Sequence, residues 1–122
     1  MLKITKPSAN RVDLELEGGI DGDTMRQGLD DLFEKSADVT KGRMLYRIVN
    51  FSMPTAEAIG VELRRLPQLF ALVGRFERCA VLSDERWLRQ VAEIEGALFP
   101  GLEIKSFELK DAAAAEAWLA ET

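Results

Sequence analysis

Two short apolar segments constrain the fold of this chain more than any other feature. Residues 44–49 and 79–82 are nearly continuous in apolar side chains, and a helical pattern follows each of them. A strand that lacks polar alternation is typical of the interior of a parallel sheet, where helices cover both faces. We therefore expect these two strands to be parallel, adjacent and buried on both faces.

The segments around them alternate between the strand period and the helix period. Strands are expected at residues 2–5 and 11–17, because Val12, Leu14 and Leu16 alternate with acidic residues. Turn-forming residues between these strands predict a hairpin. A first helix, which Asp21 or Asp23 can cap, runs through about residue 37. A last strand is expected at residues 102–109.

Two longer helices are predicted in the second half of the chain. The first begins at Thr55 and carries one apolar stripe, formed by Ile59, Leu63, Leu66, Phe70 and Val73. Pro67 interrupts it, so we expect a kink or two helices. The next helix, capped by Ser83 or Asp84, carries a stripe formed by Trp87, Val91, Ile94 and Leu98. A short alanine-rich helix, capped by Asp111, ends the pattern.

This order of elements predicts an α/β fold. Alternating strands and helices require right-handed crossovers and a mainly parallel sheet. We expect five strands, an antiparallel strand at the N-terminal edge and about four helices. No repeat or linker interrupts the sequence, so residues 1–122 are predicted to form a single domain.

Charge and composition exclude several kinds of function. The net charge is -5, which disfavours nucleic-acid binding, because that requires a basic surface. The chain has no histidine and one cysteine, Cys79, in a predicted core strand. Glycine spacing matches no nucleotide-binding loop, and the acidic residues near the first helix match no metal-binding loop. We therefore expect a non-enzyme without a cofactor or metal, and an enzyme of unknown class is the third hypothesis after the two binding roles given below.

Residues 60–90 differ in charge from the rest of the chain. They hold six arginines against four acidic residues, a net charge of +2, whereas the remainder carries -7. Arg64, Arg65 and Arg75 flank the proline-interrupted helix and could contact an anionic group. The alternative is a solvated face on which these charges are paired.

The segment 66–76 holds more apolar side chains than one buried stripe needs. If Leu66, Phe70 and Val73 face the core, other apolar residues of the segment lie partly outside it. These others are Leu69, Leu72 and Phe76. Such an excess predicts a lid, a ligand pocket or a partner face, with Trp87 beside it. Packing of an irregular helix into the core is the alternative.

Three stretches of the chain resemble the SpoIIAA-like group of STAS-domain proteins, small domains related to anti-sigma-factor antagonists. The stretches are Arg75 to Trp87, Glu103 to Phe107 and Ala112 to Leu119. The resemblance implies a βα superhelix on a five-stranded sheet, with a binding role rather than catalysis. Some members of the family resemble carriers of hydrophobic molecules and are similar in shape to CRAL-TRIO lipid-binding domains.

One departure from the family concerns phosphorylation. Sigma-regulating members carry a phosphorylatable serine before a helix, and the similar stretch here runs from Thr55 to Val61. Ala56 and Glu57 stand where that serine would be expected. Ser52 and Thr55 are nearby hydroxyls and weak phosphosite candidates, although Thr55 is explained more simply as a helix cap.

We therefore expect a STAS-like domain that binds a hydrophobic small molecule or lipid. The alternative is a protein-interaction module in an anti-sigma-like pathway, with a homodimer as a further option. The N-terminal segment is too short and charged for a signal peptide, and no apolar run is long enough to span a membrane. We expect a cytoplasmic location, with peripheral contact at the inner membrane face as an extension of it.

Overall fold

The computed structural model describes residues 1–97, 99 and 101–121, which form one five-stranded sheet with helices on both sides. The strands are β1 (Leu2–Ser8), β2 (Arg11–Glu17), β3 (Gly42–Val49), β4 (Phe76–Leu82) and β5 (Glu103–Phe107). The α-helices are α1 (Gly22–Ser36), α2 (Ala56–Arg64), α3 (Leu66–Val73), α4 (Arg86–Ala97) and α5 (Ala112–Ala120). A single 3-10 turn, Leu109–Asp111, precedes α5 in the described chain.

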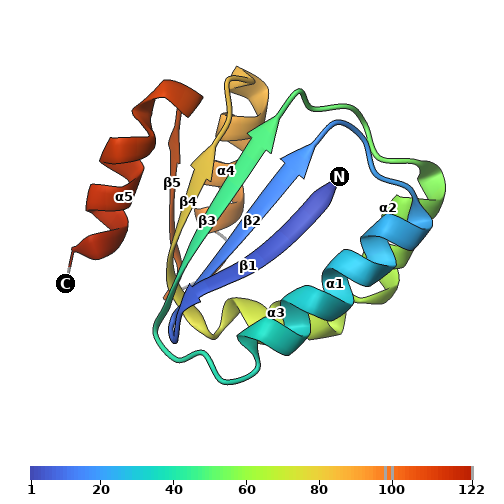
Figure 1. The fold of residues 1–122 in the computed structure, drawn as a ribbon, viewed down its shortest axis with the longest axis horizontal. Coiled ribbons are helices and arrows are strands. Elements are labelled where there is room, and N and C mark those ends of the chain that lie inside the picture. The colour runs from blue at the N-terminus through green and yellow to red at the C-terminus, as the bar shows by residue number, and fades with distance from the viewer. Residues whose placement is uncertain (98, 100, 122) are drawn as a thin grey trace.

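The order of strands in the sheet follows the order of strands in the sequence. β1 pairs with β2 antiparallel, and β2, β3, β4 and β5 are parallel to one another. Since right-handed crossovers that all step in one direction place their helices on the same face, α1 to α4 share one face. Figure 1 shows α5 on the opposite side of the sheet from α1, α2 and α3. The predicted α/β class, the mixed sheet and the edge hairpin are confirmed.

The expectation for the two apolar strands is confirmed in pairing, and its burial part is confirmed for residues 79–82 of β4 but wrong for β3. β3 and β4 are adjacent and parallel, with Met44 opposite Cys79. On the face of β3 that points toward α5, however, Arg47 is exposed and Leu45 is only half-buried. The reason is that α5 packs on β4 and β5 and leaves β1, β2 and most of β3 uncovered on that side.

The predicted break at the proline divides one expected helix into two, so there are five described α-helices rather than about four. α2 ends at Arg64, and α3 begins at Leu66 with Pro67 in its first turn, where a missing backbone donor costs nothing. Thr55 caps α2 as expected, because its hydroxyl accepts a hydrogen bond from the Ala58 N–H at 3.1 Å. Gly74 ends α3.

Other capping predictions have mixed outcomes. Asp21 caps α1 by accepting from the Thr24 N–H at 2.8 Å. Ser83 accepts from the Glu85 N–H just before α4. Asp84 instead accepts from the Leu109 N–H across the chain. The expectation that Asp111 caps the last helix is wrong, because its side chain makes no capping bond and the 3-10 turn provides the entry to α5.

Two apolar clusters stabilise the sheet, one on each face. The larger lies between the sheet and α1 to α4, and it includes the alternating residues Val12, Leu14 and Leu16 of β2. The smaller joins Ala80 and Leu82 of β4 to α5, through its residues Ala115, Trp118 and Leu119. Cys79 is buried in the larger cluster, as its place in an apolar strand predicts.

Candidate functional site

The larger apolar cluster encloses a cavity of about 360 Å³ between the sheet and α1 to α4. The floor is formed by inward-facing strand residues, among them Ile4, Leu14, Leu16, Ile48 and Val81. Protein interiors are normally packed as densely as organic crystals, so a space of this size is room that the core leaves unfilled. Its volume lies within the range of about 300–1,000 Å³ that small-molecule sites occupy.

Helix α1 forms one wall of this cavity and lies very close to the sheet. It contributes Met25, Gly28, Leu29 and Leu32 to the lining. A Cβ atom at Gly28 would lie 2.3 Å from Cδ2 of Leu2, so a glycine here allows α1 to approach β1. This close contact on one side leaves the free space toward the other helices.

The cavity opens between α2 and α4. Nineteen of the described residues line it, and the two of them that are exposed are Glu62 of α2 and Val91 of α4. Within this described lining Glu62 is also the single charged residue. The remaining residues are apolar apart from the hydroxyl of Tyr46, so the interior suits an apolar group and the mouth carries a carboxylate.

The apolar stripe of α2 and α3 does not face the core. Leu66 and Phe70, predicted to point inward, are 38% and 57% exposed, and Ile59 and Leu63 of the same stripe are exposed as well. Residues expected outside the stripe are the inward ones: Leu72 and Phe76 are buried, and Leu69 lines the cavity. The prediction of which face of these helices is buried is therefore wrong.

The reason is the size of the residues at the contact with α1. Ala58 and Val61 are the buried residues of α2, and small side chains let α2 pack close to α1. Because this side of α2 faces α1, the larger apolar residues Ile59 and Leu63 lie on another side of the helix and are exposed. Val73, the last member of the expected stripe, is half-buried at the end of α3.

The stripe of α4 is also exposed. Trp87, Val91 and Ile94 are 48%, 42% and 65% exposed, whereas Ala92 is buried and Leu88 packs against the core. The fourth expected member, Leu98, lies outside the described residues. Exposed apolar side chains thus gather on α2, α3 and α4, and Leu66, Phe70 and Trp87, which the sequence named as candidates, are among them.

Two aromatic contacts lie near the two ends of α4. Phe51, which follows β3 and lines the cavity, meets Trp87 with ring centroids 5.5 Å apart. Phe70 of α3 meets Phe99, after α4, at 5.7 Å. An aromatic pair therefore lies toward each end of α4, and one of the four rings, that of Phe51, lines the cavity.

None of the three arginines predicted to contact an anionic group lines the cavity. Arg65 forms an ion pair of 2.6 Å with Asp30 of α1 and lies over the ring of Phe33. Arg75 donates to the Val39 carbonyl on the far side of α3. Arg64 is exposed at the end of α2.

The acidic residues near α1 have structural partners. Asp21 is the helix cap, and Asp23 and Asp31 form ion pairs with Arg26 and Lys35 on the same helix. Within the described residues, no group of three or more histidine, cysteine or acidic side chains could hold a metal ion. No described helix is long and apolar enough to cross a membrane.

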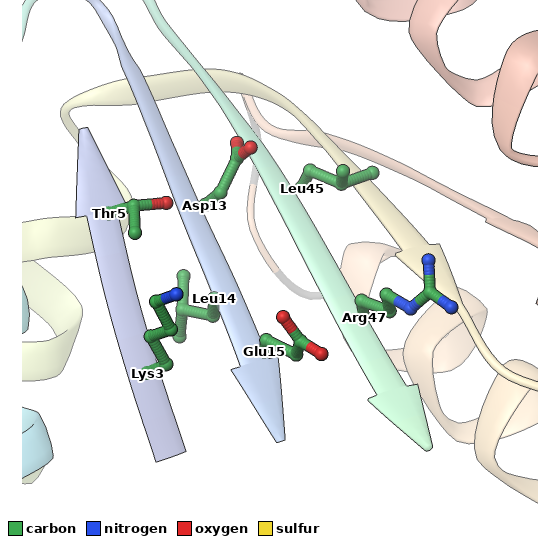
Figure 2. Close-up of a pocket in the computed structure, with 7 residues that line it drawn as sticks. All are labelled: Lys3, Thr5, Asp13, Leu14, Glu15, Leu45 and Arg47. Atoms are coloured by element: carbon green, nitrogen blue, oxygen red, sulfur yellow. The ribbon is translucent and has the colours of Figure 1, made fainter. Parts of the chain in front are cut away.

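A second, polar hollow of about 160 Å³ lies on the uncovered face of the sheet, where β1, β2 and β3 lack a helix. Figure 2 shows Lys3, Asp13, Glu15 and Arg47 projecting from these three strands. Lys3 and Glu15 are register partners, as are Glu15 and Arg47. Charges of both signs thus alternate across the strands, so this surface favours no single sign of ligand charge.

The profile of the SpoIIAA-like family matches residues 11–120. The chain belongs to the SpoIIAA-like family. A comparison with curated proteins found no match. The resemblance suggested by the three sequence stretches is therefore confirmed.

Solved structures share the SpoIIAA-like fold with this chain. An uncharacterised DUF3478-family protein from Shewanella loihica PV-4 is 18% identical, with a TM-score of 0.74, over 98% of this chain and 93% of that one. The anti-sigma factor antagonist SpoIIAA in its unphosphorylated form is 16% identical, with a TM-score of 0.54, over 99% and 100%. The phosphorylated Bacillus cell fate determinant SpoIIAA is 17% identical, with a TM-score of 0.53, over 96% and 99%.

The weak phosphosite candidates lie together at the start of α2. Ser52 is exposed in the loop after β3, and Thr55 is exposed while its hydroxyl caps the helix. Met53 between them is 70% exposed. This SpoIIAA-like chain therefore presents an accessible loop here, next to the apolar stripe of α2.

Sequence reasoning missed Glu62 and Phe51 as residues of the site. Both lie close to predicted elements, but nothing in the local pattern shows which flank of α2 faces the cavity. Two signals identified lining residues: the alternation of β2, which marks the inward face of a strand and gave Leu14 and Leu16, and the apolar excess of residues 66–76, which gave Leu69.

Proposed function

We propose that this SpoIIAA-like protein binds a hydrophobic small molecule, or the acyl chain of a lipid, without chemically changing it. The observation that supports this proposal is the cavity of about 360 Å³, whose described lining holds one charged residue among nineteen. An apolar ligand in this space would gain about 25 cal/mol for each Å² of apolar surface removed from water.

The exposed stripes provide the route by which such a ligand would enter. Leu63, Leu66 and Phe70 on one side and Trp87 and Ile94 on the other are exposed beside the opening. We propose that these side chains touch the surface of a membrane while an acyl chain moves into the cavity. We propose with it a cytoplasmic location and transient contact at the inner membrane face.

Charge limits that membrane contact. The net charge of -5 repels anionic lipids, so the contact is expected to be weak and sensitive to salt. Arg64, which is exposed at the end of α2, is the arginine best placed to meet a lipid phosphate. Arg65 and Arg75 would first have to leave Asp30 and the Val39 carbonyl.

The test fills the cavity without changing the surface. Ala92 is buried and lines the cavity, so Ala92→Phe should occupy the space that the ligand needs. Ala114→Phe, at an exposed position of α5, adds the same ring elsewhere and is the matched control. Binding of dodecanol, measured by calorimetry, should be lost only in Ala92→Phe. Equal binding by all three proteins would overturn the proposal.

Native mass spectrometry of the purified protein gives an independent measurement. A copurified apolar molecule should raise the mass of the wild-type protein and be absent from Ala92→Phe. The same spectra report whether the protein is a monomer or a dimer. A wild-type protein that carries no ligand and takes up none from dodecanol or lipid vesicles would contradict the proposal.

A protein-interaction module is the second candidate function. The observation that favours it is the exposed loop of Ser52, Met53 and Thr55 beside α2, in a fold shared with an anti-sigma factor antagonist. A crosslinkable residue at Met53 should then capture a defined partner at one-to-one stoichiometry. Met53→Asp should lose that complex, and Ala92→Phe should keep it.

A further inference from the structure

We propose that a second pocket, between the end of α1 and α3, binds a small organic acid through its carboxylate. This α1–α3 pocket has a volume of about 220 Å³ and shares no described lining residue with the apolar cavity. Its wall includes Phe33 and Ser36 of α1, Gln68 and Leu72 of α3, and Arg75, which follows α3. The inference is therefore independent of the proposed function.

The first observation is the buried hydroxyl of Ser36. Ser36 is the last residue of α1 and is 1% exposed, and its Oγ has no hydrogen-bond partner in the part of the chain that the structure describes. A buried hydroxyl without a partner is uncommon in proteins, because it forgoes the hydrogen bonds that water would give it. Since Ser36 lines the α1–α3 pocket, a ligand in this pocket can supply the missing partner.

The second observation is the guanidinium of Arg75. Arg75 is exposed and belongs to none of the described ion pairs. Its Nη1 donates a long hydrogen bond, of 3.5 Å, to the carbonyl of Val39, whose N–H donates to the Ser36 carbonyl at 3.1 Å. The guanidinium therefore reaches the turn that begins at Ser36. Because it has five N–H donors, most of them stay available to a ligand.

The charges around the α1–α3 pocket favour an anion moderately. Arg75 is the charged residue of the described lining, and the carboxylate of Asp38 on the adjacent turn is paired with Lys6. The last turns of α1 and α3 border the pocket, and their carbonyl groups carry a partial negative charge. This charge stabilises the guanidinium in its place and weakens its attraction for an anion, so we expect a millimolar affinity.

The donors and the apolar walls together define the class of ligand. Arg75 can only donate hydrogen bonds, and Ser36 and Gln68 can also donate, so an acceptor such as a carboxylate fits all three. The half-buried Phe33 and the buried Leu72 add apolar surface, which suits a ring or a short chain beside the carboxylate. The volume lies below the lower bound of about 300 Å³ for drug-sized ligands, so the acid must be small.

The experiment titrates the protein with benzoate and follows the backbone amide signals by nuclear magnetic resonance. Benzyl alcohol carries the same ring without the charge, and inorganic phosphate carries the charge without the ring. Arg75→Gln removes the guanidinium, and Ser36→Ala removes the buried hydroxyl. Arg64→Gln is the matched control, since Arg64 is exposed and does not line the α1–α3 pocket.

Benzoate should shift the amide signals of Ser36, Gln68 and Leu72 and should bind more tightly than the other two probes. Arg75→Gln should weaken benzoate binding at least about tenfold, because a hydrogen bond between charged groups is lost. Ser36→Ala should weaken it about fivefold and should not lower the stability of the protein, since the hydroxyl has no partner to lose.

Unchanged benzoate binding by Arg75→Gln or by Ser36→Ala would overturn this inference, as would equal binding of benzoate and benzyl alcohol. Phosphate that binds as tightly as benzoate would show a surface anion contact and would overturn it as well. Signal shifts at Leu14 and Leu16 instead would place benzoate in the apolar cavity, against this inference. Ala92→Phe fills that cavity and should leave benzoate binding unchanged, so the proposed function is tested separately.

Discussion

The rings of Phe51 and Trp87 meet edge to face, with centroids 5.5 Å apart and ring planes at 69°. Phe51 lines the cavity from the loop after β3, and Trp87 stands in the first turn of α4. The contact therefore connects a residue of the cavity lining to the exposed ring of Trp87. A ligand that displaces Phe51 would change the surroundings of Trp87, and this gives the site a natural reporter.

Fluorescence of Trp87 is expected to change when an amphiphile such as dodecylamine binds, because the half-exposed indole lies beside the opening. The second tryptophan, Trp118, belongs to α5 and is buried against the other face of the sheet, so its fluorescence should not respond. Trp118→Phe should therefore retain the full change and Trp87→Phe should lose it. A response that disappears with Trp118 would place the ligand on the wrong face.

Phe70→Asp is expected to weaken ligand binding at least fivefold with little loss of stability. Phe70 is exposed and contacts Phe99, so the substitution breaks one aromatic pair and places a charge on an apolar stripe. Hydrogen exchange in residues 64–76 should slow on ligand binding in the wild-type protein and in Phe70→Leu, but not in Phe70→Asp. Unchanged exchange in the wild-type protein would leave packing as the sole role of this segment.

The ion pair between Arg65 and Asp30 is expected to hold the junction of α2 and α3 against α1. The pair is partly exposed, so a double-mutant cycle with Arg65→Met and Asp30→Asn should give a coupling free energy of about 0.2–1 kcal/mol. Each variant should also speed hydrogen exchange near Leu66. A coupling energy of zero would show that packing alone fixes this junction.

Acid is expected to loosen α5. Arg11 donates two hydrogen bonds to Glu116, of 2.8 and 3.1 Å, and these bonds hold the pKa of Glu116 below its ordinary value. A carboxyl group whose pKa is lowered in the folded state contributes stability above its unfolded pKa, of about 4.3, and that contribution is lost as the pH falls through the folded value.

The measurement is the free energy of unfolding by urea as a function of pH. The wild-type protein should lose stability as the pH falls below about 4.3, where unfolded glutamate begins to take up protons. Glu116→Gln should show less of this loss. Glu34→Gln, at an exposed position of α1, should keep the wild-type profile. Identical pH profiles for all three proteins would contradict a role for this pair.

The order of elements was predictable because local patterns encode it. Alternation marked β2, and the continuous apolar runs marked β3 and β4 as parallel neighbours. Pro67 predicted the break between α2 and α3, since proline lacks a backbone donor and is tolerated only in the first turn of a helix. Such signals depend on a few adjacent residues and require no knowledge of the fold.

The burial of β3 shows where this reasoning fails. Its apolar sequence indicated helices on both faces, but α5 is short and covers only β4 and β5. The number of strands that a helix covers depends on where the helix packs, and no residue of β3 records that. The polar hollow beside Leu45 and Arg47 is the result.

The sequence by itself determined the fold class, the crossover helices and an excess of apolar residues near Pro67. Only the tertiary structure decided which of those residues face inward, because α2 and α3 carry apolar side chains on more than one flank. Close packing of the small residues Ala58 and Val61 on α1 selects one rotation of the helix. That rotation leaves Ile59 and Leu63 exposed and brings Glu62 to the cavity edge, since turning a helix about its axis moves every side chain together. On α3, a separate helix, Phe70 is exposed and Leu72 is buried.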